Sequence, residues 1–358
     1  MPTPLLFQPI TFRSVTARNR IVVSPMCQYS AVDGLGHDWH IQNLGAKAAG
    51  GAGTVIAEAT HVSAVGRITP GCLGAYDPKH QALLSRLAAV IVTCGSVPGI
   101  QLAHAGRKGS CQIPWQGGRP IHPSDGGWVP LAPSPIPMTP GAVDPHPLSA
   151  GEIETIAGQF AASARMAREA GFKLIELHSA HGYLSHSFLS PISNHRNDGY
   201  GGDLNGRMRF LMETLDAIRT EWPGELPLWV RLSCSDYMPG GLTIDDIVQV
   251  AKQLAARGDV DLIDSSSGGI SLEQKIPSLH PGYQVPFADA VKHRAGIATG
   301  AVGMITEPTH AAEILANGRA DVVLLARAVL ADPGWPLRAA KALGVKPEVP
   351  SQYLRAAL

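Results

Sequence analysis

One short segment holds the residue types that most clearly suggest chemistry. His178, His181 and Tyr183 follow directly on an apolar run, Lys173-Leu-Ile-Glu-Leu177, that is typical of a buried strand. Two imidazoles and a phenol within this segment place two hydrogen-bond donors and one proton source together. Such a set suits a reaction in which a carbonyl oxygen gains negative charge while a neighbouring carbon accepts a proton. The segment therefore predicts a catalytic site.

Other interpretations of these residues stay open. The two histidines could be structural, or they could bind zinc, which needs a third ligand; Asp236 and His280 are only loosely placed for that role. Tyr183 could be an aromatic residue of an interface or a lid. Cys27 and Tyr29 could simply be packing residues at the end of a strand.

The overall composition narrows the class of protein. The chain has 358 residues, of which 45% are hydrophobic and 16% charged, with 29 basic and 29 acidic side chains. No basic run exceeds two residues, which argues against nucleic acid or an anionic membrane as partner. There is no signal-peptide pattern and no apolar run near eighteen residues, so we expect a soluble, cytoplasmic protein. The five cysteines are scattered, which favours reduced thiols over a disulfide framework or an iron–sulfur cluster.

Short apolar runs alternate with helical patterns along the chain. Eight runs have the continuous apolar character of strands buried on both faces: 20–24, 54–58, 98–103, 173–177, 226–232, 261–264, 297–300 and 321–325. Helical periodicity lies between them, over 78–94, 149–170, 207–221, 243–257, 307–317 and 334–343. This alternation predicts an α/β fold with one (β/α)8 TIM barrel over 1–358. An open doubly wound sheet is the main rival, but no G-x-G-x-x-G follows the first strand.

Two segments do not follow this alternation of apolar runs and helical patterns. Residues 107–147 are rich in Pro, Gly and Ser and follow the third strand, so we expect a lid insertion or a small hairpin over the barrel mouth. Residues 344–358 form a C-terminal segment after the last helical pattern.

Polar residues and glycines gather where the predicted strands end, which is where barrel enzymes place their active sites. Gly303 after the seventh strand and Arg327 after the eighth are expected at the usual phosphate position of such barrels; the alternative is that the glycine only serves to turn the chain.

Several motifs in order resemble the Old Yellow Enzyme family of FMN-dependent ene reductases, in its cysteine-bearing branch of NADPH dehydrogenases and xenobiotic reductases. The resemblance runs from about Leu6 to Arg355. The matching segments are Ser24-Pro-Met-Cys-Gln-Tyr29, Gly50-Gly-Ala-Gly53, Gly99-Ile-Gln-Leu-Ala-His-Ala-Gly-Arg107, His178-Ser-Ala-His-Gly-Tyr-Leu184, Phe188-Leu-Ser-Pro191, Ser193-Asn-His-Arg196, Tyr200-Gly-Gly202 and Gly303-Met-Ile-Thr306.

The resemblance implies a set of flavin contacts. Ser24, Pro25, Met26 and Cys27 would line the flavin, with the Cys27 thiol tuning its redox potential. Ala59 and Gln101 would meet the isoalloxazine, and Arg231 would place a positive charge near the part that becomes negative on reduction. Gly303, Ala326 and Arg327 would hold the ribityl phosphate, with Ala326 standing where the family usually has Gly.

The resemblance also implies the substrate contacts. His178 and His181 would hold the substrate oxygen, Tyr29 would contact the substrate from the other side, and Tyr183 would give the proton. Arg355 would reach into the active site of a neighbouring subunit. The chain ends in Arg355-Ala-Ala-Leu358, where many relatives end in Gly and an aromatic residue.

The resemblance implies an FMN-dependent NADPH dehydrogenase that reduces the C=C bond of α,β-unsaturated carbonyl or nitro compounds. NADPH or NADH would be the reductant, activated alkenes the small-molecule substrates, no metal would be required, and the assembly would be a homodimer or homotetramer. Two rival functions are a metal-dependent aldolase or hydrolase on the same barrel and a non-catalytic carrier of flavin or another ligand.

Overall fold

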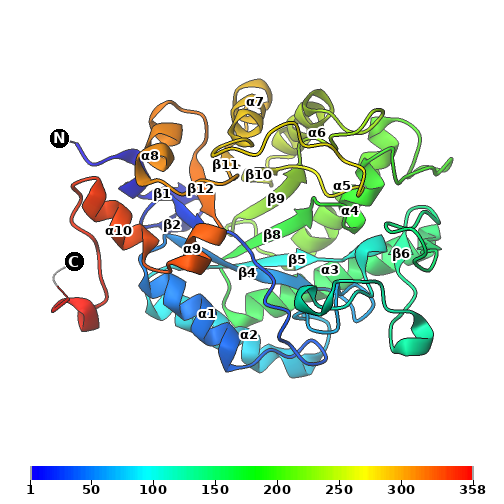
Figure 1. Cartoon of the computed structure of the whole chain (residues 1–358), viewed down its shortest axis with the longest axis horizontal. Helices are drawn as coiled ribbons and strands as arrows, with labels where there is room; N and C mark the ends of the chain where they lie inside the picture. Colours follow the sequence, from blue (N-terminus) through cyan, green and yellow to red (C-terminus); the bar gives the residue numbers. More distant parts are fainter. Residues whose placement is uncertain (1, 357–358) are drawn as a thin grey trace.

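A closed barrel of eight parallel strands forms the centre of the computed structural model, which describes residues 2–356 (Figure 1). Around the barrel the strand order is β3-β4-β5-β8-β9-β10-β11-β12, which follows the order along the chain. The strands are β3 (Ile21–Val23), β4 (Thr54–His61), β5 (Val97–Ala103), β8 (Leu174–Ser179), β9 (Leu228–Ser233), β10 (Leu262–Ser266), β11 (Thr299–Ala301) and β12 (Val322–Leu325). Each of the eight predicted runs overlaps one of these strands, so the predicted TIM barrel is confirmed.

Helices surround this barrel on the outside (Figure 1). They are α1 (Asp38–Ala49), α2 (Gln81–Thr93), α3 (Ala150–Ala170), α4 (Leu184–Leu189), α5 (Leu204–Glu221), α6 (Ile244–Arg257), α7 (Val285–Ala295), α8 (Pro308–Ala316), α9 (Arg327–Ala331) and α10 (Trp335–Ala342). Six of them match predicted helical segments. The ends of α3 show why: Ser149 and Glu152 form a capping box at its start, and Gly171 ends it with a left-handed φ of 93°.

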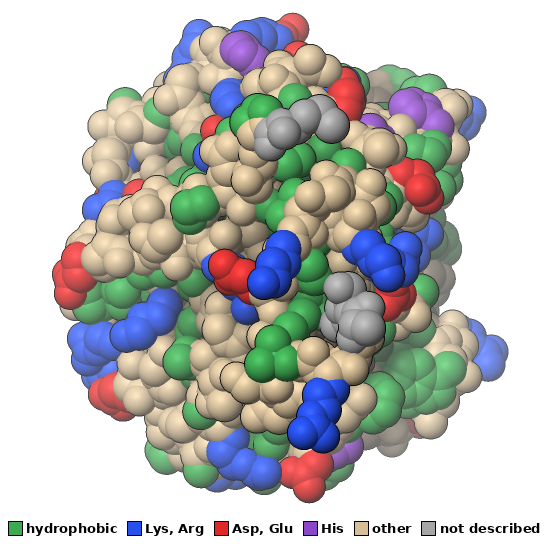
Figure 2. Space-filling view, turned by 90° about the vertical axis from the view of Figure 1, so that its left-hand side faces the viewer, with side chains coloured by type: hydrophobic (Ala, Val, Ile, Leu, Met, Phe, Trp, Pro, Cys, Tyr) green, Lys and Arg blue, Asp and Glu red, His purple; other side chains and the backbone are tan. Residues whose placement is uncertain are grey.

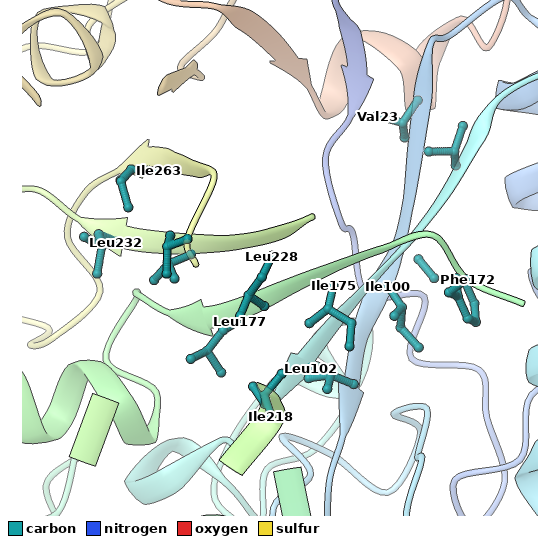
Figure 3. Packing of buried hydrophobic residues seen from close by; sticks show 14 of the residues in the cluster. Val23, Ile100, Leu102, Phe172, Ile175, Leu177, Ile218, Leu228, Leu232 and Ile263 are labelled. Atoms are coloured by element: carbon teal, nitrogen blue, oxygen red, sulfur yellow. The ribbon is translucent and has the colours of Figure 1, made fainter. Parts of the chain in front are cut away.

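Two layers of apolar side chains hold the barrel and helices together. Between strands and helices lie residues such as Leu102, Leu177 and Ile218, the last from α5 (Figure 3). Inside the barrel lies a smaller cluster that includes Val22, Leu174 and Trp229. This arrangement explains why the strands are continuously apolar, because both of their faces are buried.

A hairpin at the N-terminus closes one end of the barrel. β1 (Ile10–Phe12) and β2 (Val15–Ala17) pair antiparallel, and the Phe12 ring packs edge-on against Trp229 with centroids 5.3 Å apart. No motif or apolar run of the sequence indicated this hairpin. The hairpin covers the N-terminal ends of the barrel strands. A binding site is therefore expected at their C-terminal ends.

The segment between β5 and α3 contains short elements only. They are η3 (Gly106–Lys108), η4 (Pro114–Gln116), η5 (Pro123–Asp125), β6 (Leu131–Ala132) and β7 (His146–Pro147). β6 and β7 pair in parallel, whereas an antiparallel bridge joins Cys111 to Pro120, so the small hairpin considered for this region is reduced to that one bridge; the expectation of a lid stays a prediction. The insertion lies on the right in Figure 1, away from the two termini.

The side of the molecule that carries the termini has a mixed surface. Basic and acidic side chains are scattered across it among polar and apolar ones (Figure 2). The remaining short turns are η1 (Leu5–Phe7), η2 (Pro78–His80) and η6 (Ser351–Tyr353). Among residues 2–356, no helix combines the length and the apolar character needed to cross a bilayer.

Candidate active site

The three residues predicted to be catalytic lie together at the end of β8. His178 is in the strand, and His181 and Tyr183 are in the loop before α4. The ring centroids of His178 and His181 are 5.2 Å apart, and those of His178 and Tyr183 are 4.7 Å apart, both with nearly perpendicular planes. The predicted cluster of two imidazoles and one phenol therefore exists in three dimensions.

The backbone of this loop is bent so that the rings converge. His181 has a φ of 59°, in the left-handed region that non-glycine residues rarely adopt, and its N–H donates to the Ser233 hydroxyl at 2.9 Å. Gly182 follows with a φ of 76°, and a Cβ there would come within 2.2 Å of the Gly269 carbonyl oxygen. Only glycine fits at position 182.

Hydrogen bonds to His178 and His181 indicate which nitrogens are free to donate. His178 Nδ1 accepts from the Ala180 N–H at 3.2 Å, which places the ring proton on Nε2. His181 Nε2 lies 2.7 Å from the Ser266 hydroxyl, which also lies 3.4 Å from Gln284 Oε1. When that hydroxyl donates to Nε2 rather than to Gln284, the His181 proton is on Nδ1. Each ring then keeps one N–H for a bound molecule.

Burial controls the protonation of the same three residues. It lowers the pKa of both histidines well below the usual value, and the positive charge of Arg231 adds to the effect. Burial also raises the pKa of Tyr183 well above 10. At neutral pH the site therefore presents neutral imidazoles and a protonated phenol, which are donors without net charge.

A polar network spans the barrel interior beneath this loop. Gln101 Nε2 donates to Glu176 Oε1 at 2.7 Å, and Arg231 lies 3.0 Å from an Asp264 carboxylate oxygen. Burial raises the pKa of both carboxyl groups, and Arg231 opposes that rise. Arg231 also donates to the Ser24 hydroxyl at 3.3 Å, which joins the fifth barrel strand to the end of the first.

The predicted flavin-contacting residues at the ends of β3 to β5 are neighbours. Ala59 pairs in register with Gln101, next to a bulge in β4. Cys27 packs with Tyr29 and Tyr183 around a small apolar cluster. Burial raises the pKa of the Cys27 thiol well above its usual value, so this thiol is neutral. Pro25 and Met26 lie between Ser24 and Cys27 and are partly buried.

A cavity of about 330 Å³ lies at the ends of β11 and β12. Gly303, Ala326 and Arg327 line it, together with Gln284 and Met304. Gly303 has a φ of 119°, and a Cβ there would lie 3.1 Å from the Gln284 side chain. The backbone at this position is therefore exposed to the cavity only because residue 303 is glycine. A concave site with bare backbone and one guanidinium fits the phosphate of FMN.

A second cavity of about 340 Å³ lies under the insertion after β5. Apolar side chains dominate its lining, and Tyr29 and Lys108 contribute at the side of the catalytic cluster. Trp128 is held in this wall by donation of its ring N–H to the Val65 carbonyl oxygen at 2.8 Å. The volume is within the range of small-molecule sites.

Arg355, Asp236 and His280 do not join the cluster. Arg355 is exposed in the C-terminal segment, and no described hydrogen bond or ion pair involves its side chain. Asp236 instead lies 2.9 Å from His186 and accepts from Ser190 and the Leu242 N–H, so it is not available to the histidine pair as a zinc ligand. Within residues 2–356, no group of three or more His, Cys, Asp or Glu side chains is placed to hold a metal ion.

Sequence reasoning missed the residues that support the predicted ones. Lys108 Nζ donates to the His181 carbonyl oxygen at 2.8 Å, Ser266 contacts the His181 ring, and Glu176 and Asp264 complete the interior network. Lys108, Ser266 and Asp264 follow or end a predicted strand and Glu176 lies within one, and that position is the only signal that could have identified them.

Comparisons with known proteins identify the family of this chain. The model of the NADH:flavin oxidoreductase / NADH oxidase family matches residues 5–345. The chain is 46% identical to an NADPH dehydrogenase of Geobacillus thermodenitrificans (strain NG80-2) and 47% identical to one of Geobacillus sp. (strain WCH70), with 98% of each chain covered.

Solved structures show the same architecture. Morphinone reductase superposes with a TM-score of 0.78 at 24% identity, over 97% of this chain and 92% of that one, which bears on the fold alone. A 2-naphthoyl-CoA reductase superposes with a TM-score of 0.85 at 27% identity, over 94% of this chain and 52% of that one. The family match and the relatives confirm the resemblance found in the sequence: the chain belongs to the NADH:flavin oxidoreductase / NADH oxidase family, of the Old Yellow Enzyme type, and is an FMN-dependent NAD(P)H:flavin oxidoreductase.

Proposed function

We propose that this enzyme reduces the C=C bond of α,β-unsaturated carbonyl and nitro compounds with NADPH or NADH. The observation that carries the proposal is the close grouping of His178, His181 and Tyr183, neutral and converging, beside residues that fit FMN. When bound, FMN supplies hydride transfer between the nicotinamide and the alkene.

Two histidines bind and polarise the substrate. His178 Nε2–H and His181 Nδ1–H donate to the carbonyl or nitro oxygen, which draws electron density from the β-carbon. Because both rings are neutral, they add hydrogen bonds without a charge that would repel the positive ring of NADP⁺. Tyr29 contacts the substrate from the opposite side.

Tyr183 holds the second hydrogen. As the alkene gains a hydride at its β-carbon, the O–H bond of Tyr183 breaks and a C–H bond forms at the α-carbon. Solvent water returns a proton to the phenolate. The net reaction consumes NADPH, one proton and the alkene, and it yields NADP⁺ and the saturated product.

The residues that line the cavity at the ends of β11 and β12, and those of the interior network, are the proposed flavin contacts. Gly303, Ala326 and Arg327 would hold the phosphate, Gln101 and Ala59 would meet the isoalloxazine, and Arg231 would place its positive charge near the part that becomes negative on reduction. Ser24, Pro25, Met26 and Cys27 line the remaining side. The cavity under the insertion takes the distal, apolar part of the alkene.

Residues 1–358 act as one FMN-binding domain in the cytoplasm, with the insertion after β5 as a lid, in a homodimer or homotetramer in which Arg355 reaches a neighbouring subunit.

Anaerobic spectroscopy tests this function directly. NADPH should bleach the yellow enzyme, and cyclohexenone should restore the colour. In a His178→Ala/His181→Ala variant bleaching should persist while recolouring slows by at least about 10²-fold, because each lost donor is worth roughly 10² in rate. Recolouring of that variant at the original rate would rule out the histidines as the polarising groups, and a wild-type enzyme that never recolours would be a carrier rather than an ene reductase.

A further inference from the structure

Lys108 lies directly against the proposed proton donor. Its Nζ is 5.1 Å from the centroid of the Tyr183 ring, on the face of the ring. The same Nζ donates to the carbonyl oxygen of His181 at 2.8 Å and to that of Gly269 at 3.2 Å. Lys108 comes from the turn after β5, so its ammonium joins the end of one strand to the loops after two others.

We propose that Lys108 is a positioning residue that holds a positive charge over the Tyr183 ring and assists proton transfer from the phenol to the α-carbon. The inference rests on the proposed function, in which Tyr183 is the donor. Nothing in the described hydrogen bonds joins Lys108 to the phenol oxygen itself, so the assistance acts through the ring.

The charge matters because of what happens to Tyr183 during the step. When its O–H bond breaks and the C–H bond forms, the phenol becomes a phenolate whose negative charge spreads over the ring until water returns a proton. A cation over the face of an aromatic ring is attracted even to the neutral form, and more strongly to the anion. At about 5 Å in a partly buried site, the attraction corresponds to roughly 10-fold to 100-fold in rate.

The surroundings of Lys108 keep its ammonium charged and fixed. Burial lowers the pKa of Lys108 to about 8, and Arg107 adds to this effect, yet the side chain stays mostly protonated at neutral pH. Two of its three N–H groups bind the His181 and Gly269 carbonyl oxygens, which favours the protonated form. The ammonium is therefore held in place before the substrate arrives.

The alternative is that Lys108 acts only as a clamp between the two loops. Lys108→Gln separates the possibilities, since an amide can still donate to a carbonyl oxygen but has no charge. Lys108→Met removes both properties, and Lys108→Arg keeps the charge. Lys173→Met is the matched control, because Lys173 is exposed at the start of β8, at the opposite end of the barrel.

The test is a double-mutant cycle with Tyr183→Phe. The rate constant to measure is that of recolouring of the NADPH-bleached holoenzyme by cyclohexenone, without oxygen. Lys108→Gln should slow it by roughly 10-fold to 100-fold when Tyr183 is present and should have no further effect in the Tyr183→Phe background. Lys108→Arg should retain most of the rate. The solvent deuterium isotope effect should increase in Lys108→Gln, because proton transfer becomes more rate-limiting; a lost clamp would not cause that.

Each outcome separates this inference from the proposed function. If Tyr183→Phe slows recolouring but Lys108→Gln does not, the role of Lys108 is overturned and the proposed function stands. Equal losses with and without Tyr183 would also overturn it, since they indicate a clamp. If Tyr183→Phe leaves the rate unchanged, the proton donor of the proposed function is wrong and the inference is overturned with it. Lys108→Met shows how much further the rate falls when the hydrogen bonds between the two loops are lost as well. The melting temperature and bound FMN of this variant show whether it is still folded.

Discussion

The ion pair between Arg231 and Asp264 provides a quantitative test of the barrel interior. Arg231 Nε lies 3.0 Å from Asp264 Oδ2, without the alignment of a good hydrogen bond, and the two residues are 8% and 0% exposed. Two unit charges at this distance attract each other by about 5 kcal/mol at an effective dielectric constant near 20. We predict that Arg231→Met lowers the free energy of unfolding by about 3–5 kcal/mol, because it leaves a buried carboxylate without a partner.

The same reasoning predicts a rescue. Asp264→Asn removes the uncompensated charge, so the double variant Arg231→Met/Asp264→Asn should recover most of the lost stability. It should not recover the retention of FMN, because Arg231 is also proposed to lie at the isoalloxazine. Stability and cofactor binding should therefore separate in the double variant.

The loss of folding stability in Arg231→Met should change with pH in a defined direction. Burial raises the pKa of Asp264, and Arg231 opposes that rise, so the Asp264 pKa rises further in Arg231→Met. A carboxyl group that is protonated more readily in the folded than in the unfolded chain stabilises the fold at low pH, and this contribution is lost as pH rises through the folded pKa. The variant should consequently be less impaired near about pH 5 than near about pH 8.

Urea denaturation followed by tryptophan fluorescence, with and without added FMN, measures these effects. Arg294→Met is the matched control, since Arg294 pairs with Asp245 at 2.6 Å on the surface, where breaking an ion pair costs about 1 kcal/mol or less. If Arg231→Met costs no more than the control, or if Asp264→Asn gives no rescue, the account of the interior network is wrong.

Three further variants test the remaining contacts. Tyr183→Phe should keep the bound FMN and its reduction by NADPH but slow alkene reduction by about 10²-fold or more, measured as recolouring by cyclohexenone; an unchanged rate would contradict its role as acid. Cys27→Ala should shift the flavin reduction potential without releasing FMN, and by the same amount between about pH 6 and 8, because burial keeps the thiol neutral; an identical potential would count against the contact. Gly303→Val should release FMN on dialysis, since its side chain would enter both the cavity and the Gln284 contact; full retention would place the phosphate elsewhere.

Local patterns explain how much of the fold could be predicted. The alternation of apolar runs and helical periods is a local signal, and it identified all eight barrel strands. Helix α1 was missed because His37 caps it and His40 completes its capping box, and neither residue is a usual start signal. Helix α7 was missed because Gln284 precedes it without a side-chain cap, and its start offers only a proline.

Distance along the chain explains which parts of the site could be predicted. His178, His181 and Tyr183 lie within one short segment, so their types and spacing were visible together. The contacts that orient them join distant segments: Ser266 is 85 residues from His181, and Lys108 is 161 residues from Gly269. A sequence pattern places such residues at strand ends, but only the closed barrel decides which strand ends face one another.

Gly269 illustrates how a residue without a side chain can determine the geometry of this site. Its φ is 92°, and a Cβ at this position would lie 2.5 Å from His181 Cα, while a Cβ on Gly182 would lie 2.2 Å from the Gly269 oxygen. The loops after β8 and β10 thus approach each other as closely as two glycines allow, and the left-handed turn that aims the His181 ring depends on that approach. Gly269→Ala should push the loops apart, destabilise the protein by about 1–3 kcal/mol and slow alkene reduction more than reduction of the enzyme by NADPH. Unchanged rates of both half-reactions in the folded variant would show that His181 keeps its aim and that the close approach serves stability alone.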